Sequence, residues 1–152
     1  MEARTFDALA MAHLVMLALW GGVVATEAVI EVLPFRQREL HGAAIRFHYW
    51  IDLLVELPLV LAVIATGVVL FISLDPVTPV HLVKVGLGGA AVAVNLFCIV
   101  VVVRRGRRLA QKADEAALWR ASRTVLMCFA AGLSCAAGAA VLGFRFAIER
   151  LG

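Results

Sequence analysis

Five side chains that could bind a metal ion or carry protons lie within two long apolar stretches of the sequence. They are Glu27, Glu31, His48, Asp52 and Glu56. In each stretch the spacing is four residues, which keeps the side chains on one face of a helix. An ionisable group in an apolar segment is costly, so it usually faces inward toward a partner or a ligand. The pattern therefore predicts a buried functional site.

The composition identifies the segments that carry these residues as membrane helices. Of the 152 residues, 63% are hydrophobic and only 16% are charged, which excludes an ordinary soluble domain. A bilayer core is crossed by about 20 helical residues. Four apolar stretches are long enough, at 8–33, 45–74, 79–103 and 125–148. Because the connections are short, we expect an all-α fold: a single-domain, integral membrane, antiparallel four-helix bundle.

The basic residues predict the orientation of this bundle in the membrane. They cluster beside the first and third connections, as Arg36, Arg38, Arg46, Arg104, Arg105, Arg107, Arg108, Lys112, Arg120 and Arg123. The positive-inside rule places these basic loops in the cytoplasm and both termini outside, as expected for a protein of a bacterial inner membrane. Basic residues beside a bilayer orient the chain and contact anionic lipid. Since no aromatic residues alternate with them, a nucleic-acid partner is not expected.

Depth in the membrane favours one shared site for the acidic residues. The first helix runs inward and the second returns, so Glu31 should lie level with His48, and Glu27 level with Asp52. Pro58 should loosen the second helix just beyond these residues. No Lys or Arg is expected at the same depth. The carboxylates would repel one another unless protons or a bound cation neutralise them.

The ligand types favour a divalent transition metal. Histidine with carboxylate oxygens suits Zn²⁺, Fe²⁺ or Mn²⁺ better than Cu⁺. All five residues named at the outset are candidate ligands, with bridging carboxylates if two ions bind, and a redox activity would be possible. Two alternatives stay open. The residues could form a proton or metal-ion pathway in an oligomer, or they could simply pair with polar neighbours such as Asn95 and stabilise the bundle.

A second set of residues suggests a different cofactor. His13 lies near the outer start of the first helix, and His81 near the outer start of the third. Paired imidazoles at similar depth could hold heme b, in an electron carrier or an oxidoreductase. Lys84 and a group of glycines share that region of the third helix. Heme b bound by His13 and His81 is therefore the main alternative to the carboxylate site.

The same residues resemble a known family. The motifs are His13 with Trp20-Gly21-Gly22, and His81-x-x-Lys84-x-Gly-Leu. They are similar to the first and third helices of small membrane proteins related to the protoporphyrinogen oxidase HemJ and to the copper-resistance CopD domain. The resemblance covers about two helices. It implies heme b near His13 with Lys84 close by, and redox chemistry or copper handling. The acidic face of the second helix is not part of that pattern.

Small residues follow one another every four positions along the fourth stretch. They are Ala130, Ser134 and Gly138, with Ala131, Cys135 and Ala139 beside them. Such spacing allows two helices to approach closely. The contact could lie within the bundle or between subunits of a homo-oligomer, and both possibilities stay open.

Overall fold

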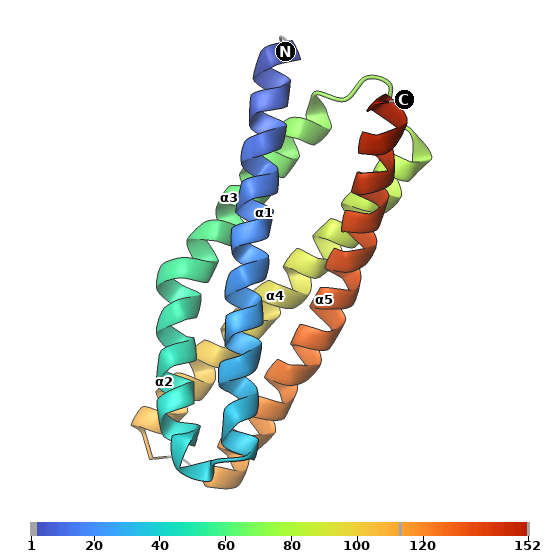
Figure 1. Ribbon diagram of the computed structural model, residues 1–152. Coiled ribbons are helices and arrows are strands. Elements are labelled where there is room, and N and C mark those ends of the chain that lie inside the picture. The colour runs from blue at the N-terminus through green and yellow to red at the C-terminus, as the bar shows by residue number, and fades with distance from the viewer. Residues whose placement is uncertain (1–2, 113, 152) are drawn as a thin grey trace.

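Four long helical segments run alternately up and down along the molecule (Figure 1). The computed structural model describes residues 3–112 and 114–151. The first segment is α1 (Ala3–Val32), and it leads into two short turns, η1 (Leu33–Phe35) and η2 (Arg38–Leu40). The second segment is continuous through α2 (His41–Ile51), η3 (Asp52–Glu56) and α3 (Leu57–Ile72). The last two segments are α4 (Pro79–Ala110) and α5 (Glu115–Leu151).

The predicted all-α fold is confirmed. In the part of the chain that the structure describes, there is no strand, and all four segments are long and apolar enough to cross a membrane. The start of α1 and the end of α5 lie at the same end of the molecule (Figure 1), as expected for an even number of crossings. These features indicate an integral membrane protein. The orientation of the loops stays a prediction.

Two helices extend well beyond the apolar stretches that predicted them. α4 continues to Ala110 rather than ending near position 103, and α5 begins at Glu115 rather than near 125. Hydropathy falls where Arg and Lys begin, but both residues are good helix formers, so the helices continue past the apolar stretches. Much of the basic sequence between the last two apolar stretches is therefore helical, and it can contribute to the interior of the bundle.

The second segment contains a wide turn just where the polar residues occur. In η3 the backbone N–H of Leu57 bonds to the carbonyl oxygen of Asp52, five residues earlier instead of four. This is a π-helical turn, a feature often found at functional sites. Pro58 lacks an N–H, and its ring would clash with the carbonyl of Leu54 in a regular helix. The predicted loosening before Pro58 is thus confirmed.

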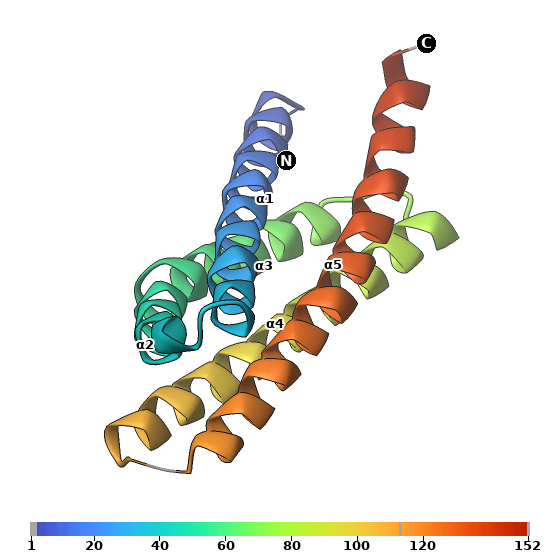
Figure 2. The same cartoon turned by 60° about the horizontal axis from the view of Figure 1, so that its bottom comes forward.

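The helices pack through small apolar clusters. α4 and α5 lie side by side (Figure 1 and Figure 2), and Gly138 of α5 faces the side chain of Leu87 on α4. Part of the small-residue stripe therefore packs inside the bundle. Ala130 and Ser134 of the same stripe are exposed, and the homo-oligomer stays a prediction. α4 also approaches α2 closely at Gly106, where an added Cβ atom would lie 2.6 Å from the ring of Tyr49.

Candidate functional site

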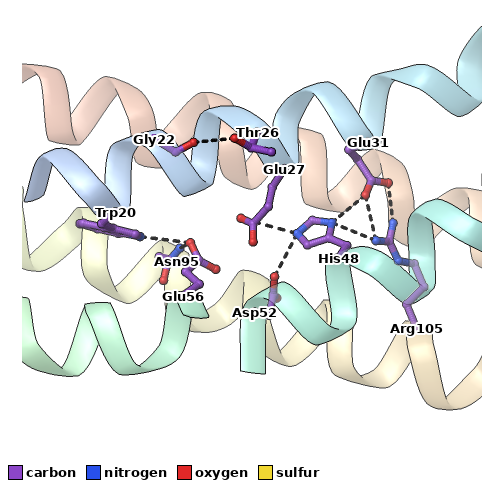
Figure 3. A network of polar contacts seen from close by, with 10 residues as sticks. All are labelled: Trp20, Gly22, Thr26, Glu27, Glu31, His48, Asp52, Glu56, Asn95 and Arg105. Carbon is purple, nitrogen blue, oxygen red and sulfur yellow. Dashed lines mark hydrogen bonds and ion pairs between the residues drawn. The ribbon is translucent and has the colours of Figure 1, made fainter. Parts of the chain in front are cut away.

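A group of ionisable side chains is buried where α1, α2, η3 and α4 meet (Figure 3). We call this group the polar centre. It consists of Glu27, Glu31, His48, Asp52 and Arg105, each at most 2% exposed. α1 contributes the two glutamates, α2 the histidine, η3 the aspartate and α4 the arginine. The centre therefore combines residues from three of the four long segments.

The predicted pairing of depths is confirmed for the first and second segments. Glu31 Oε2 lies 2.9 Å from His48 Nδ1. On the other side of the ring, His48 Nε2 lies 3.2 Å from Asp52 Oδ1 and 3.9 Å from Glu27 Oε2. His48 thus stands between one carboxylate on its Nδ1 side and two on its Nε2 side.

The expectation that no Lys or Arg lies at this depth was wrong. Arg105 is completely buried, and its two terminal nitrogens bond to the two carboxylate oxygens of Glu31. Paired bonds of this kind, between an arginine and a carboxylate, are among the stronger hydrogen bonds in proteins. Arg105 lies on the buried face of α4 that also carries Asn95, Cys98 and Val102. Extending that helical spacing past the end of the apolar stretch would have found it.

These contacts fix which ring nitrogen of His48 carries a proton. Glu31 is held as a carboxylate by Arg105, and a carboxylate oxygen only accepts hydrogen bonds. At 2.9 Å, the Nδ1–H of His48 must therefore donate to Glu31. Arg105 Nη2 lies 3.2 Å from the same nitrogen but already donates to Glu31 at 2.8 Å. A neutral His48 then presents the Nε2 lone pair to Glu27 and Asp52.

The carboxylates of Glu27 and Asp52 lack hydrogen-bond partners. All four of their oxygens are buried, and none accepts a hydrogen bond from the residues that the structure describes. The 3.2 Å approach of His48 to Asp52 is within ion-pair distance but lacks hydrogen-bond geometry. One ligand atom from each of Glu27, His48 and Asp52 can be chosen so that all three lie within 4.8 Å of one another. Buried polar atoms without partners are rare and call for an explanation.

Glu56 lies apart from this group. Its Oε1 accepts hydrogen bonds from Trp20 Nε1 at 3.1 Å and from Asn95 Nδ2 at 2.6 Å. The sequence left open that these residues pair with polar neighbours such as Asn95 and stabilise the bundle. For Glu56 this structural pairing is confirmed. This residue joins α1, η3 and α4, and its contacts are those of a structural partner.

A further row of polar contacts leads from the polar centre toward the basic end of the bundle. Arg105 donates to Ser122 Oγ at 2.8 Å, and Ser122 lies 3.1 Å from His41 Nε2. The His41 ring stacks on Trp119, with centroids 3.9 Å apart, and Trp119 meets Phe35 edge-on. Sequence reasoning missed Ser122 and His41, because neither type is unusual near the end of a membrane helix.

The residues of the heme alternative each have a structural partner. His13 Nδ1 lies 2.7 Å from Thr66 Oγ1 and links α1 to α3. His81 Nδ1 accepts a hydrogen bond from the backbone N–H of Thr78 and caps the start of α4. Lys84 packs against α5. Heme binding by these residues stays a prediction.

The fold and the polar centre define the class of this protein as a helical integral membrane protein with a buried cluster of ionisable residues. No protein-family model, curated protein or solved structure matches the chain. What the cluster does must therefore be argued from its own geometry and charge.

Proposed function

We propose that the protein binds a divalent transition metal ion at Glu27, His48 and Asp52. The observation that carries the proposal is the set of four buried carboxylate oxygens without hydrogen-bond partners, beside the Nε2 atom of His48. A cation at this point would coordinate oxygens that have lost their hydrogen bonds to water on burial and have no protein partner to replace them.

The charge balance supports a divalent ion. Arg105 offsets the charge of Glu31, which leaves Glu27 and Asp52 as two further buried acidic groups beside the His48 ring. Two like charges in a low-dielectric interior repel each other strongly. One divalent cation cancels both charges.

The surroundings of His48 also favour a metal ligand. A histidine that binds a metal usually donates its other ring N–H to a carboxylate or carbonyl, which orients the ring. Here Glu31 accepts that hydrogen bond, and Arg105 holds Glu31 in turn. Ligand atoms about 2.0 to 2.2 Å from a shared ion lie roughly 3 to 4 Å apart. A small inward rotation of the carboxylates would bring the three ligand atoms, now within 4.8 Å, to that spacing.

This proposal narrows the ligand set that the sequence suggested. Glu31 already bonds to Arg105 and His48, and Glu56 already accepts two hydrogen bonds. Both act outside the coordination sphere. Imidazole and carboxylate ligands suit Zn²⁺, Fe²⁺ or Mn²⁺. An iron or manganese ion would allow redox activity, whereas zinc would not.

One further function is favoured by a specific observation. His48 lies between Glu31 on its Nδ1 side and Asp52 and Glu27 on its Nε2 side. Chains of histidine and carboxylate groups carry protons in membrane proteins. In this alternative, a proton on His48 Nε2 replaces the metal ion beside Asp52 and Glu27.

Metal analysis of the purified protein tests the proposal. We expect about one Zn, Fe or Mn per chain in detergent, and at least a tenfold loss of bound metal in Asp52→Asn, because ligand loss is severe in such sites. Asp75→Asn makes the same chemical change in an exposed loop and should keep its metal. Glu27→Gln provides a second ligand variant if Asp52→Asn does not fold.

Two results would contradict the metal site. A folded wild-type protein that binds none of these ions when they are supplied would leave the proton relay as the better explanation. Equal metal content in Asp52→Asn and the wild type would make Asp52 a structural residue. A visible absorption spectrum of the same sample tests the heme alternative, since a Soret band would assign the cofactor to His13 and His81 instead.

A further inference from the structure

A second polar feature lies at the basic end of the bundle, outside the polar centre. It is a pocket of about 260 Å³ between α4 and α5. Arginines from both helices line it, namely Arg104, Arg105, Arg108 and Arg120, above apolar residues that include Val101 and Ala121. No acidic residue is part of the lining. The pocket therefore has the charge of an anion site.

Three of the four arginines that line the pocket are not neutralised by the protein, whereas Arg105 is paired with Glu31. Arg104, Arg108 and Arg120 form no ion pair and no side-chain hydrogen bond with any residue of 4–112 and 114–143, the ranges whose side chains the structure describes. Arg105 is fully buried, and although its terminal nitrogens are bonded, its Nε atom has no partner. Planar guanidinium groups bind phosphate oxygens through paired hydrogen bonds. Three arginines without a partner among these residues thus line one small volume, together with the buried Arg105.

The position of the pocket along α4 corresponds to a membrane surface. The 32 residues of α4 span about 48 Å at 1.5 Å per residue, whereas the hydrocarbon core is about 30 Å thick. Arg104 and Arg108 lie in the last two turns of this helix. They are therefore expected at the level of lipid headgroups.

An apolar track leads from the pocket along the outside of α4. Phe97 and Val100 are 56% and 45% exposed, and they precede Arg104 by seven and four residues. Residues with this spacing share one helical face. An acyl chain lying on Phe97 and Val100 would bring its phosphate to Arg104. A free phosphate ion would make no use of this track.

We propose that this pocket binds the phosphate of an anionic phospholipid, with the acyl chains along the exposed face of α4. Basic pockets between membrane helices are known to hold such headgroups. The site is distinct from the metal ligands, and its occupation does not require the metal. Arg105 belongs to both the pocket and the polar centre, because it lines the pocket and bonds to Glu31.

Native mass spectrometry of the metal-loaded protein in detergent tests this proposal. The probes are phosphatidylglycerol, phosphatidylcholine with the same acyl chains, and inorganic phosphate. The test variant is Arg104→Gln/Arg120→Gln. The matched control is Arg107→Gln/Arg123→Gln, which removes one exposed arginine from each of the same two helices but leaves the pocket lining intact.

We expect phosphatidylglycerol to bind at least tenfold more tightly than phosphatidylcholine. Its affinity should fall at least tenfold in the pocket variant and less than twofold in the control. Equal losses in the two variants would overturn the proposal, because they would indicate diffuse attraction by the basic surface. Unchanged affinity in the pocket variant would also overturn it. So would inorganic phosphate that competes at the same concentration as the lipid, since the ligand would then be a free ion.

Discussion

Arg105 is the residue on which the charge balance of the polar centre depends. It brings the only arginine or lysine charge that is fully buried in 4–112 and 114–143, where side chains are described, and it offsets Glu31 through two hydrogen bonds. By holding Glu31, it also fixes the proton on His48 Nδ1. The ring nitrogen that faces Glu27 and Asp52, Nε2, is therefore set by a residue on another helix.

Replacing Arg105 should destabilise the protein more than replacing any exposed arginine. Arg105→Gln leaves the Glu31 carboxylate buried without its cation, and breaking such a pair costs about 3 to 5 kcal/mol. Arg104→Gln removes a neighbouring exposed charge and should change the free energy of unfolding by less than about 1 kcal/mol. Denaturant unfolding in detergent measures both values.

A double variant separates lost pairing from lost packing. In Glu31→Gln/Arg105→Gln neither member of the pair leaves its partner's charge unpaired, so the double variant should be more stable than Arg105→Gln alone. If the losses in free energy of unfolding from the two single substitutions simply add in the double variant, the broken ion pair does not cause the destabilisation of Arg105→Gln.

The sequence identified the acids and His48 because ionisable residues stand out against an apolar background. Their depth in two antiparallel helices then predicted that Glu31 lies level with His48. Arg105 could not be recognised in this way, because it stands among six other basic residues between 104 and 123. Only the continuation of the buried face of α4 distinguishes it from its neighbours.

At the scale of the elements, the close approach of α4 to α2 depends on Gly106. A Cβ atom at this position would lie 2.6 Å from Tyr49 Cδ2, so Gly106→Ala forces the ring or the helix to move. Such overpacking costs about 1 to 3 kcal/mol. Gly89→Ala on the same helix meets nothing within 4 Å and should be neutral or stabilising, since alanine favours a helix by about 1 kcal/mol. Thermal unfolding of the two variants compares them, and equal melting temperatures would contradict the packing argument.

The number and direction of the helices followed from hydropathy, whereas their ends did not. The apolar stretch at 79–103 predicted α4 but missed its last two turns, which run to Ala110. The free energy of membrane insertion changes where the charges start, but backbone hydrogen bonding continues through them. The wide turn at η3 was foreseen only as a loosening near Pro58, because hydropathy carries no information on how the backbone adjusts.

For the molecule as a whole, metal binding should add to the stability of the fold. The proposed ligands come from α1, α2 and η3, and a ligand that binds only the folded state stabilises it. A strong chelator should therefore lower the melting temperature of the wild-type protein in detergent by several degrees, and added Zn²⁺, Fe²⁺ or Mn²⁺ should restore it.

The ligand variant provides the control for this effect. Asp52→Asn should melt at the same temperature with and without the chelator, because it starts without metal. A chelator that lowers the melting temperature of both proteins equally would place the bound ion elsewhere.

The wide turn at η3 also bears on how the length of this chain can change. A regular helix turns by about 100° per residue, so one residue removed from its middle rotates everything beyond it onto another face. A π-helical turn holds one residue more than the α-helical turn it replaces. Loss of the exposed Leu54 would remove the extra residue of η3 while α2 and α3 kept their present faces. At this one place in the second segment, a single-residue deletion would keep His48 and Val60 directed into the bundle.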